Sequence, residues 1–346
     1  MKLSAPELRL LRLQGQHLLT PAPREAVLAD LCGLQAQLYP CALHGLRLRS
    51  GELPAALPAV RTWTLRGTLH LIREADLPLL IHRRGAPEEV CAFETYAFLC
   101  AHGRPLPPER AVFFAQTVYD ALAAGPQTRE DLRQLCRQRG MTPAEEAQVF
   151  HAWGGVIRQL SEMGLICGTA EKDRRYRRCG DFVPLPRTDA RRLLLERYLR
   201  HYGPASLADM AYFFRWPQRE LKALLAELPA EQHRLEGETL FSLGLSAPAR
   251  PLPPCRLLAG FDPLMLGYEK RRSCFLPPEY LRGIFNLTGM VFPALLIQGV
   301  TAGRWKLQPK ALQLTAFRQL DAREREAVRE EADRLFPGLA IELEQA

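Results

Sequence analysis

Two glutamines, Gln35 and Gln37, are the residues of this sequence whose type and spacing most directly suggest chemistry. A glutamine side chain has one acceptor and two donors, which can orient a water molecule but are too weakly basic to deprotonate it in advance. On a continuous helix, residues at this spacing point about 200° apart. Gly33 and Pro40 bracket the motif, so we expect the helix to break there and let both amides reach one water. Taken alone, a Gln-x-Gln tripeptide is most often a pair of solvated polar residues.

Basic residues gather on a second segment, which we predict to be a β-hairpin with its turn near Glu171–Asp173. They are Lys172, Arg174, Arg175, Arg177 and Arg178. Several cations on one element are what binding to phosphate groups requires. A charged hairpin that is merely solvated is the alternative.

The segment from Arg61 to Ile72 alternates apolar and polar residues, which predicts a single strand with one apolar and one polar face. Arg66, Thr68 and His70 share the polar face, and the segment has no acidic residue. These side chains line a pocket or bind a phosphate, or they tie this first wing to its neighbours, and the sequence leaves these interpretations open.

Few other residues are candidates for chemistry. Asp262 either assists the reaction or pairs with Arg271 or Arg272 to hold the last domain, and we favour the pairing. The nine cysteines include no pair at the spacing of a zinc or redox motif, and the eight histidines include no His-x-x-x-His pair. We therefore expect no metal and no cofactor.

The totals describe an ordinary folded protein: of 346 residues, 47% are hydrophobic and 24% are charged, and the formal net charge is +8. A basic balance indicates an acidic partner only where the cations cluster. No apolar run approaches the roughly 18–20 residues that span a bilayer, and the N-terminus carries no hydrophobic segment of a secretory signal. We expect a cytoplasmic protein that does not bind membranes.

An internal repeat predicts the elements that position these residues. In each copy, a Gly-Pro pair is followed at fixed spacing by a hydroxyl residue and an aspartate. The copies are Gly125-Pro126 with Thr128 and Asp131, and Gly203-Pro204 with Ser206 and Asp209. Gly and Pro end one helix, and the hydroxyl residue caps the next, with the acid in its first turn. Because a further helix and a hairpin follow each copy, the repeat predicts two winged helices.

The N-terminal region is interpreted as a third copy, because Ser4 and Glu7 have the spacing of a capping box. A proline-rich stretch at 247–254 marks a boundary, and beyond it short strand-like runs and a closing helix at about Asp321–Leu335 predict a small domain. The predicted fold is α+β, mainly α, with three tandem winged-helix motifs and a small C-terminal α+β domain. The predicted domains are 1–95 with the Gln-x-Gln motif, 96–186 with the basic hairpin, 187–246 as the third winged helix, and 247–346.

Several segments in this order along the chain, taken together, resemble one known family. They are Leu31–Pro40 with Arg61–His70, Gly260–Tyr268 with Arg271 and Arg272, and Gly303–Trp305. The family is that of the AlkZ-like (YcaQ-related) winged-helix DNA glycosylases. Its members have three winged-helix motifs and hydrolyse the N-glycosidic bond of N7-alkylated purines, and some unhook interstrand crosslinks. One branch carries a Gln–apolar–Gln catalytic motif, which Gln35 and Gln37 match.

The resemblance implies that these two glutamines are catalytic, that the basic hairpin lies along a DNA groove, and that the partner is double-stranded DNA containing alkylated bases. An N7-alkylguanine is already positively charged and departs as a neutral base without an acid, so two amides suit such a substrate and uncharged lesions should react poorly. No lysine lies in the motif region, so we expect a monofunctional enzyme. The alternatives are a non-catalytic winged-helix regulator and a protein-binding scaffold. Regulators usually dimerise, and the sequence has no heptad-like dimerisation helix, so we expect a monomer.

Overall fold

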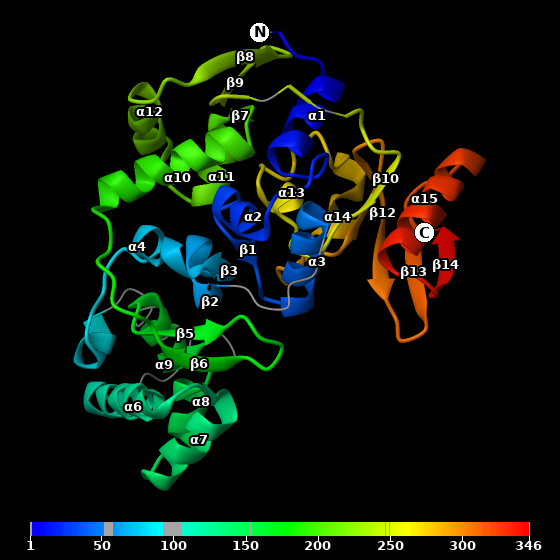
Figure 1. Ribbon diagram of the computed structural model, residues 1–346. Coiled ribbons are helices and arrows are strands. Elements are labelled where there is room, and N and C mark those ends of the chain that lie inside the picture. Colours follow the sequence, from blue (N-terminus) through cyan, green and yellow to red (C-terminus); the bar gives the residue numbers. More distant parts are fainter. Residues whose placement is uncertain are drawn as a thin grey trace. The chain divides into compact units, whose positions relative to one another are not determined.

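The computed structural model describes residues 2–51, 58–92, 106–151, 154–245, 247–248 and 250–345. Helices and strands are mixed along the chain (Figure 1). The contacts divide it into two compact units, Met1–Ala55 with Arg192–Ala346, and Ala56–Arg191. The first of the four predicted domains is therefore shared between the units, and the finer four-part division stays a prediction. Among the described helices, none has the length and apolar character that a membrane span needs.

The first unit begins with α1 (Ala5–Gly15), α2 (Arg24–Asp30), the two-residue strand β1 (Leu34–Gln35) and α3 (Tyr39–Ser50). The capping box predicted for α1 is confirmed, since the Ser4 side chain accepts from the backbone N–H of Glu7 and the Glu7 carboxylate accepts from that of Ser4. The second helix, α2, ends at Asp30, before the motif begins.

The internal repeat is confirmed as a structural repeat. In the first unit it comprises α10 (Arg187–His201), β7 (Ala205–Ser206), α11 (Leu207–Phe214), α12 (Gln218–Ala226), β8 (Glu231–Leu235) and β9 (Glu238–Ser242). In the second unit it comprises α6 (Pro108–Ala121), β4 (Gln127–Thr128), α7 (Arg129–Gln138), α8 (Pro143–Val149), α9 (Gly155–Glu162), β5 (Ile166–Thr169) and β6 (Arg175–Arg178). Ser206 caps α11 and Thr128 caps α7, each through a capping box with the predicted aspartate. The short strand before each capped helix pairs with the second strand of the hairpin that follows it.

The C-terminal part of the first unit is a five-stranded sheet in the order β10-β11-β12-β13-β14. Its strands are β10 (Cys255–Leu257), β11 (Ala294–Ile297), β12 (Val300–Leu307), β13 (Ala311–Ala316) and β14 (Ala340–Gln345). The predicted closing helix is α15 (Ala322–Leu335), which connects the parallel pair β13 and β14 and packs on the sheet through Val328, Ala332 and Leu335 (Figure 1). Between β10 and β11 lie two short helices, α13 (Pro263–Leu266) and α14 (Leu281–Ile284).

The second unit contains strands in the order β3-β2-β5-β6-β4. Its remaining elements are β2 (Ala59–Trp63), the 3₁₀ turn Leu65–Gly67, β3 (Leu69–Arg73) and the short helix α4 (Leu77–Leu80). A buried core joins α6, α7 and α9 to the β5–β6 hairpin, including Phe114, Leu132, Ile157 and Tyr176.

Two sequence predictions in the second unit are wrong. The segment from Arg61 to Ile72 is two antiparallel strands instead of one, because Arg66 and Gly67 both have positive φ and reverse the chain. The single further helix predicted after the first copy of the repeat is two helices, since α8 ends at Val149 and α9 begins at Gly155. Gly155 has a φ of 52°, and a side chain there would lie 2.2 Å from the carbonyl oxygen of Gln148.

Candidate active site

The Gln-x-Gln motif lies in an extended segment between two helices. After α2 ends, Cys32 and Gly33 take left-handed conformations with φ of 56° and 86°, and α3 begins only at Tyr39. Leu34 and Ala36 are buried, whereas Gln35 is half-buried and Gln37 is exposed. In an extended chain, alternate residues share a side. The predicted break is confirmed: no helix runs through the motif, and Gln35 and Gln37 are less buried than Leu34 and Ala36.

The segment is backed by the chain from Ala259 to Pro263. Gln35 and Leu34 border a small gap together with Cys41 and Asp262. Asp262 is buried and accepts two hydrogen bonds, of 2.7 and 3.0 Å, from the buried guanidinium of Arg49 on α3. It also caps α13 by accepting from the backbone N–H of Leu264. We expected Asp262 to form an ion pair, and it does, but with Arg49, which lies 213 residues away in sequence. The predicted partners Arg271 and Arg272 were wrong.

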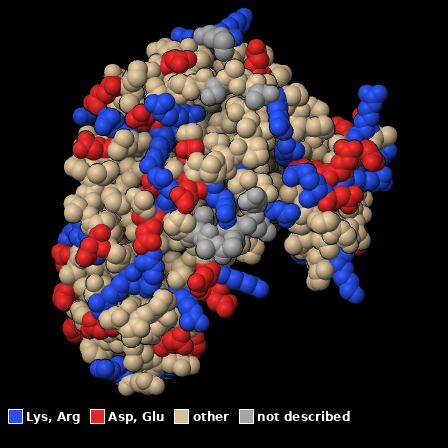
Figure 2. Space-filling model, in the orientation of Figure 1, with Lys and Arg blue, Asp and Glu red and all other residues tan. Residues whose placement is uncertain are grey.

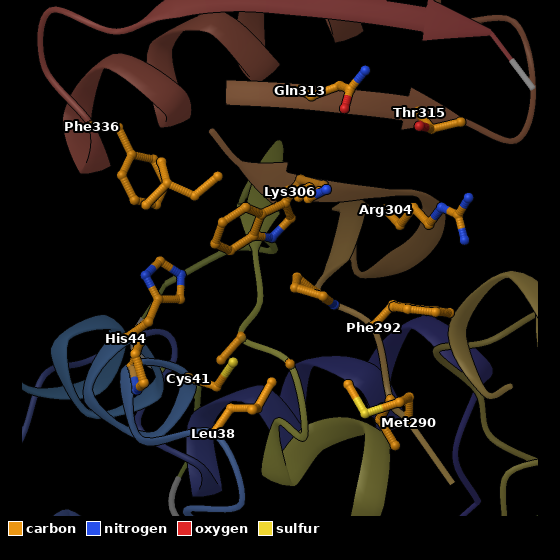
Figure 3. A pocket seen from close by; sticks show the side chains of 17 residues that line it. Leu38, Cys41, His44, Met290, Phe292, Arg304, Lys306, Gln313, Thr315 and Phe336 are labelled. Atoms are coloured by element: carbon orange, nitrogen blue, oxygen red, sulfur yellow. The ribbon is translucent and has the colours of Figure 1, made fainter. Parts of the chain in front are cut away.

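A cavity of about 710 Å³ opens beside the motif, within the first unit (Figure 3). One side is formed by Leu38, Pro40, Cys41 and His44, at and after the start of α3. The other sides come from the C-terminal sheet and its loops, and they include Met290, Phe292, Arg304, Trp305, Lys306, Gln313, Thr315 and Phe336. Leu38 directly follows Gln37 in the chain, so the cavity begins next to the second amide. The sequence did not predict this cavity, because the residues that form its two sides lie more than 200 positions apart in the chain.

Of the polar residues that the sequence singled out, the β2–β3 hairpin of the second unit buries His70, while Arg66 and Thr68 are half-buried. Thr62 and His70 face each other across the two strands and are 0% and 2% exposed, because α9 covers this face. His70 Nδ1 donates to the carbonyl of Thr68, so the neutral ring presents Nε2 as an acceptor to Arg66 at 3.4 Å. Burial, together with the charge of Arg66, lowers the pKa of His70 to about 3. The Thr68 hydroxyl donates to the carbonyl of Leu65 within the turn. These contacts favour the tying role over a phosphate contact.

The predicted basic hairpin is β5–β6, and its loop spans 170–174. Lys172 and Arg175 are exposed at this end, alongside Glu171 and Asp173. Arg174 is half-buried over the Tyr176 ring at 5.2 Å.

The other two cations of the hairpin are held by acids. Arg177 forms an ion pair of 2.7 Å with Glu74. Arg178 donates to the carbonyl of Tyr119 at 2.9 Å and lies 3.4 Å from Asp120. At most three of the five predicted cations are therefore available to phosphates without breaking an ion pair.

One residue that positions this loop was missed by the functional reading of the sequence. Arg61 on β2 is buried and donates to the backbone carbonyls of Thr169 at 2.7 Å and Glu171 at 2.8 Å. A guanidinium with several fixed donors is suited to such a bridge. Charge alone did not distinguish it from the other arginines, which are interspersed with acids over the face shown in Figure 2.

One cluster of the described residues has the donor set of a metal site. His17 and His201 contact opposite oxygens of Asp30 through their Nε2 atoms, at 2.8 and 3.3 Å. The hydrogen bond of His201 Nδ1 to the carbonyl of Gly15 fixes its tautomer. Burial raises the pKa of Asp30, but the His17 hydrogen bond and nearby positive charges outweigh it and leave the pKa lowered. The His17–Asp30 hydrogen bond accounts for part of the cluster, while the neutral His201 ring has no proton on Nε2 to donate to Asp30. The absence of a bound metal stays a prediction.

Comparison with known proteins assigns the family. The model of the family described as "DNA glycosylase AlkZ-like" matches residues 28–337. The chain belongs to this AlkZ-like DNA glycosylase family. It is accordingly a DNA glycosylase that acts on DNA, and the regulator alternative is not favoured.

Two similarities add to this assignment. A curated relative from Streptomyces sahachiroi is named an interstrand DNA cross-link repair glycosylase. It is 25% identical over an alignment of 366 positions, gaps included, which covers 96% of this AlkZ-like chain and 95% of the relative. The solved structure of the Streptomyces sahachiroi DNA glycosylase AlkZ has the same fold, with a TM-score of 0.78 at 22% identity and full coverage of both chains.

Proposed function

We propose that this glycosylase hydrolyses the N-glycosidic bond of N7-alkylated purines in double-stranded DNA, with Gln35 and Gln37 as its catalytic residues. The observation that carries the proposal is the break between α2 and α3, which leaves Gln35 and Gln37 as less buried positions of a non-helical segment. The relative's name supports a substrate range that includes bulky adducts and interstrand crosslinks. The proposed enzyme is a cytoplasmic monomer with three winged-helix motifs.

The reaction needs no acid, because the N7-alkylguanine leaves as a neutral base. As the bond from C1′ to N9 breaks, its electron pair goes to the base and the sugar becomes an oxocarbenium-like cation. The amide oxygens of Gln35 and Gln37 accept hydrogen bonds from one water and direct its oxygen to C1′. The new C–O bond makes that water strongly acidic, and its proton passes to solvent. The products are the free base and an abasic site.

DNA binding is proposed for the loop end of the β5–β6 hairpin. Its available cations are Lys172, Arg174 and Arg175, while Arg61 holds the loop in place. Arg66, Thr68 and His70 support the neighbouring β2–β3 hairpin in this proposal and do not contact phosphate.

The test is a single-turnover assay on duplex DNA with one N7-methylguanine, followed by alkaline cleavage of abasic sites. We expect release by the wild type and a loss of about 100-fold in Gln37→Ala, with duplex affinity unchanged. Exposed Gln319→Ala is the matched control, because it makes the same change at a glutamine far along the chain from the motif. Equal release by wild type and Gln37→Ala would remove Gln37 from the mechanism.

A further inference from the structure

We propose that the 710 Å³ cavity beside the motif is the binding site for the apolar, aromatic part of a bulky adduct attached to the damaged base. This inference rests on the proposed function, because it assigns a binding place beside the same site to the bulky group of the proposed lesions. Its first argument is size. Cavities of roughly 300–1,000 Å³ enclose drug-sized groups, and a methyl group needs no such space.

The second argument is position. Leu38 follows Gln37 directly and lines the cavity mouth, where it is 45% exposed. Cys41, Ala259 and Gly260 form part of the cavity wall and also border the gap behind Gln35. A group covalently attached to a base whose C1′ faces the two amides is therefore within reach of the cavity.

The third argument is the apolar and aromatic lining. His44 stacks on Phe336 with ring centroids 5.6 Å apart and meets the edge of Trp305 at 5.0 Å. The Trp305 indole N–H and the His44 Nε2 both hydrogen-bond to backbone carbonyls, of Leu258 and Leu257 respectively. Burial lowers the pKa of His44, which favours its neutral form. The aromatic end of the cavity is thus uncharged and suited to a flat apolar group.

The fourth argument is the polar wall, which distinguishes this cavity from one lined only by apolar groups. Arg304 lies opposite Thr315 and Lys306 opposite Gln313 across β12 and β13, so all four side chains share one sheet face (Figure 3). Two cations beside an apolar floor suit an apolar group that is tethered to a polyanion. An aromatic adduct on DNA has this combination, whereas a free apolar metabolite or a lipid tail does not use the cations.

The experiment compares binding of two duplexes that differ only in the substituent on one guanine N7, methyl or naphthylmethyl. A 2′-fluorine on that nucleotide slows hydrolysis, so that affinity is measured without release. We expect the wild type to bind the naphthylmethyl duplex at least about tenfold more tightly than the methyl duplex. Gln313→Trp and Thr315→Trp, made separately, each fill the cavity from the sheet. In each variant the ratio of the affinities for the naphthylmethyl and methyl duplexes should be close to one.

Lys310→Trp is the matched control, because it adds the same side chain at an exposed position of the same sheet connection outside the cavity lining. It should keep the wild-type preference, and thermal unfolding should show all three variants folded. An absent preference in the wild type, or a preference that survives both cavity-filling variants, would overturn the proposal. If the wild type binds the naphthylmethyl duplex more tightly but releases neither the methylated nor the naphthylmethylated guanine from substrates without the 2′-fluorine, the proposed function is overturned and the cavity assignment stands.

Discussion

The Gln35–Gln37 segment and the β2–β3 hairpin both attracted attention as polar residues at alternate positions, yet the structure uses them in opposite ways. In the first, the apolar residues Leu34 and Ala36 are buried, whereas Gln35 is half-buried and Gln37 is exposed. In the second, the strands are buried on both faces, and the polar Thr62 and His70 lie under α9. Alternation therefore marks two faces in each region without saying whether either face meets solvent.

The difference also separates two kinds of polar chemistry. His70 spends both ring nitrogens on protein partners, and its pKa falls to about 3, so it stays neutral under ordinary conditions. Gln37 is exposed and keeps its hydrogen-bonding capacity accessible to a ligand. A reactive segment needs side chains whose backbone is held in place and whose functional groups remain accessible to the ligand.

The largest expected effect comes from removing the support behind the glutamines. Asp262→Ala leaves the Arg49 guanidinium buried without its partner, which should lower the free energy of unfolding by about 3–5 kcal/mol. Urea unfolding measures this. The double variant Arg49→Met with Asp262→Asn removes both charges and should recover most of the loss. A single variant within 1 kcal/mol of the wild type would show that the pair does not hold the segment.

The next effect tests whether the two amides act on one water. Gln35→Ala and Gln37→Ala should each slow release of N7-methylguanine by about 100-fold, and the double variant should be little slower than either single variant. Single-turnover rates provide the comparison. Fully multiplied losses would mean that the two side chains act independently.

A third effect concerns pH and sharpens the contrast with His70. Since the folded pKa of His70 is about 3, well below the usual value near 6.5, the unfolded chain binds the extra proton first. Its contribution to stability is complete above about pH 6.5 and decreases as the pH falls, by about 2 kcal/mol between pH 6.5 and 5. Urea unfolding at several pH values should show this decrease reduced in His70→Gln.

The release rate should respond differently to pH from stability. Amides do not titrate, so the single-turnover rate should be nearly flat from about pH 6 to 9. A rate that falls with a midpoint near 6.5 would place a histidine in the mechanism.

The smallest effect is expected at the basic hairpin. With about three available cations, its contribution to the slope of log affinity against log salt should be near −2.7, less steep than five contacts would give. Arg175→Ala should reduce the slope by about 0.9, whereas Arg178→Ala, which is already paired with Asp120, should leave it almost unchanged. Equal changes in the two variants would show that DNA breaks the Arg178 ion pair.

Much of the local structure was predictable from the sequence, because caps and turns are encoded by neighbouring residues. Ser4, Thr128 and Ser206 all cap the helices that follow them, and the break near Gly33 is present. The error at Arg61–Ile72 has a simple origin: His70 faces Thr62 across the turn, so the alternation of polar and apolar residues continues through the chain reversal.

The candidate site was predictable only in part. The amide motif was found through the whole-chain resemblance, and its local geometry through Gly33 and Pro40. The pairing of Asp262 with Arg49 and the aromatic wall of the cavity depend on tertiary contacts between distant segments. The pairing of Arg177 with Glu74 likewise decides which cations are available, and no local pattern reports it.

The left-handed turn at Cys32 and Gly33 has one more consequence. The connection between the end of α2 at Asp30 and the start of α3 at Tyr39 is short. Both helices are held in place by their buried residues. The backbone of the proposed catalytic segment is thus ordered before any DNA binds, and the entropy of ordering it is lost during folding instead of during turnover. Lengthening this connection by a single residue would keep both amides in the protein but change their orientation relative to each other.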